Sequence, residues 1–258
     1  MTHDPAYRRI LHRMGYYDYQ QGLIYRHLDQ EGGWESHLHN SRRFILKAAA
    51  IINPVKVTVL GSGWLLDFPL KEISEMACEV CLVDIVHPPE VIDQVSTLHN
   101  VKLKEDDVTG GLIREVWEKC SGRRFFRRLR SPREIRIPDY QPDEDPGMVV
   151  SLNILTQLES LPLACIRNRL KARESEYYLF RKEIQKKHID FLKKHESVLI
   201  TDLSEVVVDS LGKVTEEPSV VTDLPRGRLR EEWTWCFEDK RPDYYTRRSD
   251  FKVLAIVV

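Results

Sequence analysis

The sequence predicts an α/β fold with a doubly wound, mostly parallel sheet. From residue 55 onward, short runs rich in β-branched residues alternate with helical segments, the order expected of strand–helix–strand units. These runs are apolar without a break, as expected of strands that helices cover on both faces. The first run ends in Gly61-Ser62-Gly63, a turn that directs backbone N–H groups at a ligand beyond the strand's carboxyl end.

Residues 1–54 predict a helical extension ahead of the sheet. The segment is amphipathic, carries clustered tyrosines and is interrupted by Gly32-Gly33. Asn40 and Ser41 are good N-cap residues, so we expect a second helix to begin near them. The chain is therefore divided into this extension and a sheet domain, 55–258.

The elements of the sheet domain follow from hydrophobic periodicity and from glycine and proline boundaries. The expected strands are residues 55–60, 80–86, 101–103, 148–154, 197–200, 232–237 and 251–258. The expected helices are residues 65–76, 91–98, 111–119 and a long one within 163–194.

A charged insertion is expected at about 121–146. Residues 121–136 contain seven arginines around Phe125 and Phe126, and an acidic run, 139–145, follows. One interpretation is a solvated surface insertion. The other is a surface for RNA or a phosphate-bearing substrate, because arginine binds phosphate bidentately. The acidic run and the near-neutral chain count against extensive nucleic-acid contact.

Bulk properties narrow the class of protein. The formal net charge of -1 gives no global reason to expect nucleic acid or an anionic membrane as partner. Met1 to Arg13 is charged, so no secretory signal is predicted, and no apolar run is long enough to span a bilayer. Five cysteines are an odd number, and Cys78 and Cys81 lack a second metal-binding pair. We expect a cytoplasmic protein without a metal.

Polar residues follow the later strands. Asp84 ends the second strand, and a carboxylate there can accept both ribose hydroxyls of a nucleoside cofactor; alternatively it is a turn acid. Asp106 and Asp107 follow the third strand, and Asn153 and Gln157 follow the fourth. Carboxyl ends of parallel strands share one edge of a sheet, so these side chains are expected near the glycine turn.

In these features the chain, from about Val55 to Val258, resembles the class I S-adenosylmethionine-dependent methyltransferases. The resemblance implies a Rossmann-like, seven-stranded sheet whose last strand is antiparallel, with S-adenosylmethionine as cofactor. The glycine turn would lie against the cofactor's amino-acid part, Asp84 would bind ribose, and Asp107, rather than Asp106, would bind the adenine amino group. The implied cofactor-binding residues are Gly61, Ser62, Gly63, Asp84, Ile85, Asp107, Val108 and Asn153.

The sequence also departs from the patterns of this and related families. Val59 stands where the family often has an acid, and Leu65 stands at its third glycine. A nicotinamide cofactor would require glycine at Leu66, and no phosphate-binding P-loop occurs. The family's signature for amino-group methylation is absent at Asn153-Ile154, which counts against a nucleobase or glutamine amide substrate. The Pro-Cys pair of RNA cytosine methylation is absent as well.

Catalytic residues are not fixed by a motif, because methyl transfer depends largely on positioning. Weak candidates are His37, Asn153 and Gln157; His37 or His39 could act as a base from an extension folded over the cofactor as a lid. Arg42 or Arg43 could bind the cofactor's carboxylate, and His87 is expected as a loop residue beside the adenosine. Trp233 and Trp235 are expected to be packing residues.

The leading hypothesis is an S-adenosylmethionine-dependent methyltransferase that acts on a small molecule. A second is a non-catalytic S-adenosylmethionine-binding or scaffold protein of the same fold, and a third is an RNA-directed methyltransferase. The oligomeric state and the methyl acceptor do not follow from the sequence.

Overall fold

The computed structural model describes residues 4–30, 32–121, 129–238 and 248–258. Its strands are β1 Lys56–Leu60, β2 Glu79–Asp84, β3 Val101–Glu105, β4 Met148–Leu152, β5 Ser197–Val208, β6 Val214–Pro218, β7 Leu229–Glu238 and β8 Arg248–Val257. Its helices are α1 Pro5–Met14, α2 Tyr16–Asp29, α3 Glu35–Ile52, α4 Leu70–Met76, α5 Pro89–Val95, α6 Leu112–Ser121, α7 Ser160–Arg167 and α8 Glu174–Leu192, with a 3-10 turn at Pro132–Glu134.

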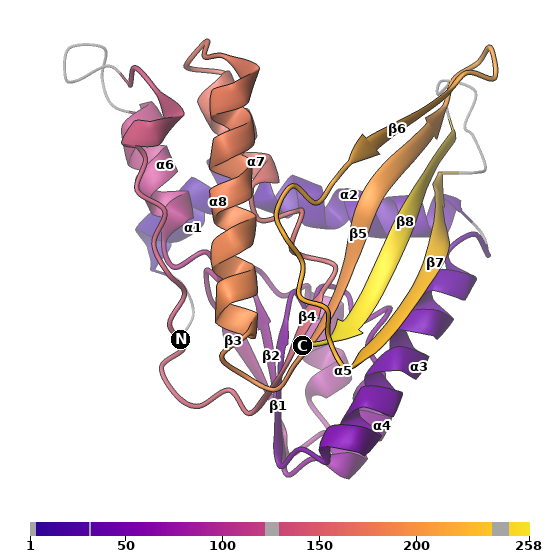
Figure 1. The fold of residues 1–258 in the computed structure, drawn as a ribbon. Helices are drawn as coiled ribbons and strands as arrows, with labels where there is room; N and C mark the ends of the chain where they lie inside the picture. The colour runs from indigo at the N-terminus through magenta and orange to yellow at the C-terminus, as the bar shows by residue number, and fades with distance from the viewer. Residues whose placement is uncertain (1–3, 31, 122–128, 239–247) are drawn as a thin grey trace.

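The described strands form one sheet in the order β3-β2-β1-β4-β5-β8-β7, and β6 pairs with the outer part of β5 (Figure 1). Strands β1 to β5 are parallel, whereas β8 runs antiparallel to both β5 and β7. The predicted α/β fold with an antiparallel last strand is therefore confirmed, and so is the resemblance to the class I methyltransferases at the level of the fold.

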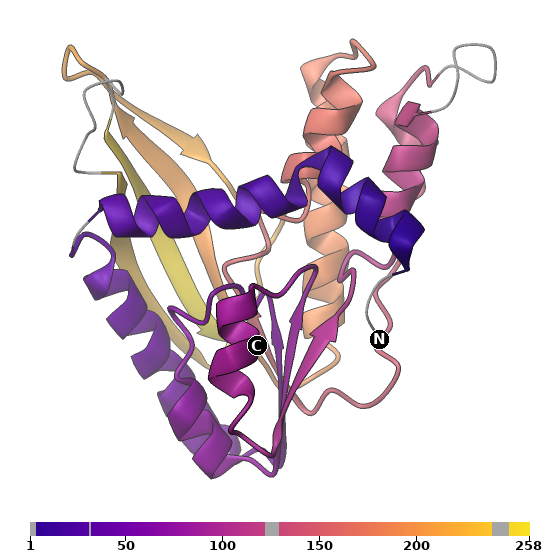
Figure 2. The same cartoon turned by 180° about the vertical axis from the view of Figure 1, so that it is seen from behind.

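Helices cover both faces of the parallel part of the sheet. Helices α3, α4 and α5 lie on one face and bury a core that includes Phe44, Ile73 and Val91 (Figure 2). The other face packs against α8 through Ile189 and Leu192. This two-sided burial explains the unbroken apolar runs of β1 and β4.

Helix α2 lies across the carboxyl ends of the parallel strands (Figure 2). The Gln20 side chain donates to the carbonyl of Val86 (2.8 Å), and the indole of Trp64 donates to the Gln20 carbonyl (3.0 Å). Helix α2 is thereby tied to the loops that follow β1 and β2. The distal halves of β5, β7 and β8, with β6, extend beyond this edge of the sheet (Figure 1).

Two helices, α3 and α4, begin at other residues than the sequence predicts. Helix α3 begins at Glu35, directly after the Gly32-Gly33 turn, so Asn40 and Ser41 lie inside it. The helix expected from Leu65 begins only at Leu70, because Leu65 has a positive φ of 58°. Proline at 69 also disfavours helical geometry in the residue before it.

The long helix expected within 163–194 is two helices, α7 and α8. Tyr177 causes the break locally, because its hydroxyl donates to the Leu170 carbonyl and accepts from the N–H of Ala172 (3.0 Å). Strand β6 was not predicted, since its five residues are all exposed and lack the apolar pattern of a buried strand. It adds an eighth strand to the seven expected.

The charged insertion is described only in part. Its residues 122–128, which hold four of the seven arginines and both phenylalanines, lie outside the described residues. In the ranges that the structure describes, no helix combines the length and apolar character needed to cross a membrane.

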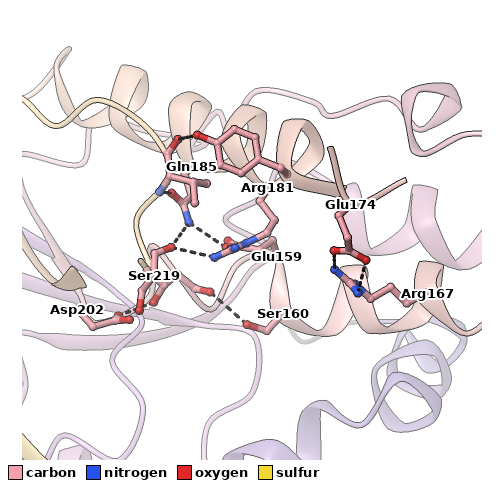
Figure 3. Close-up of polar contacts among 11 residues, drawn as sticks. Glu159, Ser160, Arg167, Glu174, Arg181, Gln185, Asp202 and Ser219 are labelled. Carbon is pink, nitrogen blue, oxygen red and sulfur yellow. Dashed lines mark hydrogen bonds and ion pairs between the residues drawn. The ribbon is translucent and has the colours of Figure 1, made fainter. Parts of the chain in front are cut away.

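A buried polar network joins α7, α8 and the segment after β6 (Figure 3). Glu159, just before α7, accepts from Gln185 (2.9 Å) and pairs with Arg181 (3.2 Å). Arg181 and Gln185 both donate to the carbonyl of Ser219 (3.0 Å each), and Gln185 accepts from the N–H of Val221 (2.7 Å). Burial raises the pKa of Glu159 to about 7.

Glu159 is therefore expected to make stability depend on pH. The folded state binds its proton more tightly than the unfolded state, so its contribution to stability is full below pH 4.5 and is lost as the pH rises through about 7. This loss amounts to up to about 3 kcal/mol in the free energy of unfolding, and we expect Glu159→Gln to remove it.

Urea unfolding between pH 4.5 and 8 measures the effect. Glu174→Gln is the matched control, because Glu174 is an exposed acid at the start of α8 that pairs with Arg167 at the end of α7 (Figure 3). The same pH slope in Glu159→Gln as in the natural protein would contradict the assignment.

Candidate functional site

A cavity, here called the main cavity, lies at the carboxyl ends of the parallel strands and is closed by α2. It is lined by all eight predicted cofactor-binding residues: Gly61, Ser62, Gly63, Asp84, Ile85, Asp107, Val108 and Asn153. His37 and Gln157, the other candidates named from the sequence, line it as well. The strand-end reasoning thus identified residues that the fold brings together, while their contact with a cofactor stays a prediction.

The glycine turn has two different steric requirements. Gly61 has a φ of 79°, and a Cβ there would lie 1.8 Å from Cγ2 of Ile154, so the turn packs directly on the end of β4. Gly63 has a φ of 51°, but a Cβ would meet nothing closer than a backbone oxygen at 4.0 Å. The open side of Gly63 therefore leaves room for a ligand against the backbone.

Leu65, at the position of the family's third glycine, has a positive φ. Its φ of 58° lies in the left-handed region, and its side chain is buried among the core residues beneath the turn. Burial of a leucine side chain stabilises by about 1.5–3 kcal/mol, which offsets the roughly 1–2 kcal/mol cost of that conformation. The substitution at this position is therefore compatible with the turn.

Asp84 connects the ends of β1 and β2. One carboxylate oxygen accepts from the N–H of Gly63 and the other from the N–H of Ile85, each at 2.7 Å. Burial raises the pKa of Asp84, while these backbone N–H groups oppose the shift. A carboxylate has about four acceptor positions, so Asp84 retains capacity for hydroxyl groups of a ligand in the cavity.

Asp107 and Asp106 are held differently. Asp107 accepts from the Tyr7 hydroxyl (3.0 Å) and from the N–H of Thr109 (2.9 Å), and burial raises its pKa. Asp106 pairs with Lys104 (3.0 Å) and accepts from Tyr140 (3.2 Å). Both line the main cavity, but the charge of Asp106 is already neutralised by a lysine, which favours Asp107 as the acceptor for a ligand.

Asn153 occupies a constrained position after β4. Its φ is 52°, its N–H donates to the carbonyl of Ile200 (2.8 Å), and Gln157 donates to its carbonyl (2.5 Å). Its Nδ2 donates to Asp67 (2.7 Å), since a carboxylate only accepts. Oδ1 of this 8% exposed residue then has no partner among the described residues. Burial raises the pKa of Asp67.

His37 is enclosed by aromatic rings. It stacks on Trp235 (centroids 3.9 Å apart, planes 7° apart), and its Nδ1 accepts from the indole N–H of Trp233 (3.1 Å). The proton of the neutral ring is then on Nε2. Nδ2 of Asn153 lies 3.2 Å from this Nε2. Because both nitrogens carry hydrogen, this contact is not a hydrogen bond. Burial lowers the pKa of His37 to about 3, which makes it a poor base at neutral pH.

Of the remaining residues named from the sequence, Trp235 lines the main cavity, whereas Arg42, Arg43, His39, His87 and Trp233 do not. Arg42 donates to the carbonyl of Leu66, and Arg43 pairs with Glu231 on β7. His39 is exposed, and His87 is buried with Nε2 3.2 Å from the carbonyl of Lys104.

Three contributions to the cavity were not anticipated from the sequence. Asp67 lies in the turn after Gly63, where it orients Asn153. Tyr16 and Tyr19 line the cavity from α2. The sequence contained a signal for Asp67, because a carboxylate six residues beyond Gly61 lies close to the glycine turn. The tyrosines reach the site only because α2 crosses the edge of the sheet.

A second cavity, here called the acidic cavity, adjoins the main one. The two share Tyr19, Leu23, Asn153, Gln157, Ser160 and Trp235. The acidic cavity extends toward the distal halves of β5, β6, β7 and β8 and contains Asp202, Glu205 and Glu217. Space for a second ligand therefore lies next to the end of β4.

Comparisons with known proteins identify distant structural likenesses only. No family model and no curated protein matches the sequence. The chain is similar to N-methyltransferase NodS from Bradyrhizobium japonicum in complex with S-adenosyl-L-homocysteine, at 9% identity over 83% of this chain and 85% of that one, with a TM-score of 0.38.

It is also similar to a DhpI–SAH complex (11% identity, 92% of this chain, 95% of that one, TM-score 0.35) and to an rRNA methylase from Streptococcus thermophilus (12% identity, 85% and 96%, TM-score 0.34). These values are too low to support an argument about function. The class I methyltransferase fold of this chain rests on its own strand order.

Proposed function

We propose that this protein is an S-adenosylmethionine-dependent methyltransferase that acts on a small molecule. The observation that carries the proposal is the common cavity lined by the glycine turn and by polar residues after three further parallel strands. S-Adenosylmethionine supplies a methyl group on a sulfonium, which is already a good electrophile, so the protein's task is to bind and to align.

Different residues of the main cavity would bind different parts of the cofactor. Asp84 would accept the ribose hydroxyls, and Asp107 would accept the adenine amino group, with Ile85 and Val108 beside the rings. The open face of Gly63 would lie against the amino-acid part. The roles of Asp84 and Gly63 use an acceptor position and a space that the described residues leave available. Asp107 already accepts from Tyr7, from the N–H and hydroxyl of Thr109 and from the N–H of Ile113, so the adenine amino group would have to share or replace one of these donors.

Buried polar atoms in the main cavity support the presence of a ligand. Oγ of Ser62 and Oδ1 of Asn153 are buried and have no hydrogen-bond partner among the described residues. A buried polar atom without a partner costs about 1–3 kcal/mol, and a polar ligand that satisfies these atoms would remove that cost. The cavity therefore fits a polar cofactor better than an apolar one.

Asn153 and Gln157 would orient the acceptor, because they lie where the main and acidic cavities meet. We assign His37 to the cavity wall rather than to proton transfer, since burial keeps its pKa near 3 and its Nδ1 is engaged by Trp233. Transfer of labelled methyl from S-adenosylmethionine to a metabolite extract distinguishes an enzyme from a non-catalytic binding protein. An RNA-directed enzyme would instead label RNA.

Binding of S-adenosylhomocysteine, measured by calorimetry, tests the cofactor site. We expect the protein to bind it and expect Asp84→Asn to weaken binding by about 1–3 kcal/mol, because the NH2 that replaces one carboxylate oxygen cannot accept a hydrogen bond from a ribose hydroxyl. Asp93→Asn, an exposed position on α5, is the control and should bind normally. Absence of heat at millimolar ligand would exclude the proposed cofactor.

The two glycines of the turn should respond differently to alanine. Gly61→Ala should lower the melting temperature strongly, because the new Cβ would overlap Ile154. Gly63→Ala should cost only about 1–2 kcal/mol of backbone strain but should weaken S-adenosylhomocysteine binding, because its Cβ enters the main cavity. Equal losses of stability with unchanged affinity would contradict this division.

A further inference from the structure

The distal halves of β5, β7 and β8, together with β6, form one wall of the acidic cavity. One row of paired residues crosses these four strands. Glu217 of β6 is opposite Glu205 of β5, Glu205 is opposite Phe251 of β8, and Phe251 is opposite Trp235 of β7. Directly opposed residues of antiparallel strands point to the same face, and all four line the acidic cavity. This wall is therefore acidic on the β5–β6 side and aromatic on the β7–β8 side.

The negative charge of the acidic cavity is not balanced by the described residues. Asp202 and Glu205 are half-buried and accept hydroxyl hydrogen bonds from Thr156 and Ser249, respectively, but neither has an ion pair in the described ranges. The side chain of Glu217 has no hydrogen bond or ion pair there either. A positively charged ligand would offset the cost of holding the half-buried carboxylates of Asp202 and Glu205 near each other, whereas the exposed Glu217 would add only attraction at the cavity rim.

Arg181 is the cation among the residues that line this cavity, and it is already engaged. It pairs with Glu159 at 3.2 Å and donates to the carbonyl of Ser219 at 3.0 Å (Figure 3). The positive charge of Arg181 is therefore already compensated by Glu159 within the polar network. The lining has three further carboxylates against this one paired guanidinium.

Asn153 supplies an independent indication of a ligand. It lies where the acidic and main cavities meet, it is 8% exposed, and its Oδ1 has no partner among the described residues. An amide oxygen in this state requires a hydrogen-bond donor. The indole N–H of Trp235, another residue of the cavity lining, is also buried without a partner in the described ranges.

Aromatic rings complete the chemistry of the wall. Trp235, Phe237 and Phe251 contact one another at centroid distances of 5.0 to 5.8 Å, and Tyr19 faces the same cavity from α2. His37 stacks on one side of Trp235, and Trp34 and Arg26 lie against the ring of Phe237. The parts of these rings that line the cavity bind apolar skeletons by burial. A metal ion fits less well, since no group of three or more His, Cys, Asp or Glu in the described ranges is arranged to hold one.

We propose that the acidic cavity is the acceptor site and that it takes a cationic amine carried on an apolar or aromatic skeleton. The carboxylates would attract the ammonium group, the aromatic rings would contact the skeleton, and Oδ1 of Asn153 would accept an N–H. Before transfer the ammonium would lose one proton to a cavity carboxylate or to water. The freed nitrogen lone pair would then form the N–CH3 bond as the S–CH3 bond breaks, which leaves S-adenosylhomocysteine. The assignment as an acceptor site rests on the proposed methyltransferase function, whereas selective binding of an amine does not.

Binding of arylalkylamines in the absence of cofactor tests the proposal. The probes are protonated benzylamine, 2-phenylethylamine and 3-phenylpropylamine at pH 7.5, each compared with the alcohol of the same length by calorimetry and by tryptophan fluorescence. We expect at least one amine to bind tenfold or more tightly than its alcohol. No preference for any amine over its alcohol would overturn the proposal.

Charge-removing variants locate the site. Asp202→Asn with Glu205→Gln should abolish the preference for the amine, and Glu217→Gln should reduce it several-fold without affecting folding, because Glu217 is exposed. Glu216→Gln is the matched control, since the neighbouring Glu216 pairs with Lys252 instead (2.7 Å) and is absent from the cavity lining. An undiminished preference in Glu217→Gln and in the folded double variant would place the amine elsewhere and contradict the proposal.

A parallel titration with S-adenosylhomocysteine separates this proposal from the one on which it rests. Selective amine binding without S-adenosylhomocysteine binding would reject the acceptor role and leave an amine-binding site. Binding of S-adenosylhomocysteine with no amine preference would reject the amine site and leave the methyltransferase proposal standing. Where both bind, labelled methyl should appear on the preferred amine; its absence from every amine that binds would overturn the acceptor role.

Discussion

The hydrogen bond from the N–H of Gly63 to Asp84 is the contact on which the geometry of the site depends. At 2.7 Å it joins the ends of β1 and β2, which are already in parallel register. On the other side of the turn, Gly61 packs on Ile154 beyond β4. The turn is thus fixed between two neighbouring strand ends, and this fixation leaves Gly63 open to the cavity and directs a buried carboxylate into it.

Much of this arrangement was predictable from the sequence because the carboxyl ends of parallel strands meet at one edge of a sheet. Once β1, β2, β3 and β4 were recognised, the positions of Asp84, Asp107 and Asn153 followed from chain order. The conformation of Leu65 did not follow, since a buried leucine usually continues a helix; here Leu65 adopts a left-handed backbone. The helix expected from that residue was wrong for the same reason.

Other features depended on contacts between distant parts of the chain. The break between α7 and α8 is bridged by hydrogen bonds of the Tyr177 hydroxyl, and β6 is stabilised by pairing with β5 rather than by burial of its own side chains. The acidic cavity depends on the registers of β5, β6, β7 and β8, which bring acidic and aromatic residues into one row. A single sequence does not specify such registers, so this wall was visible only in the structure.

The central claim is that the main cavity holds an adenosyl cofactor between the glycine turn and the following strand ends. A crystal structure of the protein with S-adenosylhomocysteine tests it most directly. We expect the ribose hydroxyls within hydrogen-bond distance of Asp84, the adenine near Asp107 and the sulfur facing Asn153. Ligand bound away from Asp84 and Gly63, or a main cavity that stays empty at saturating ligand, would contradict the account.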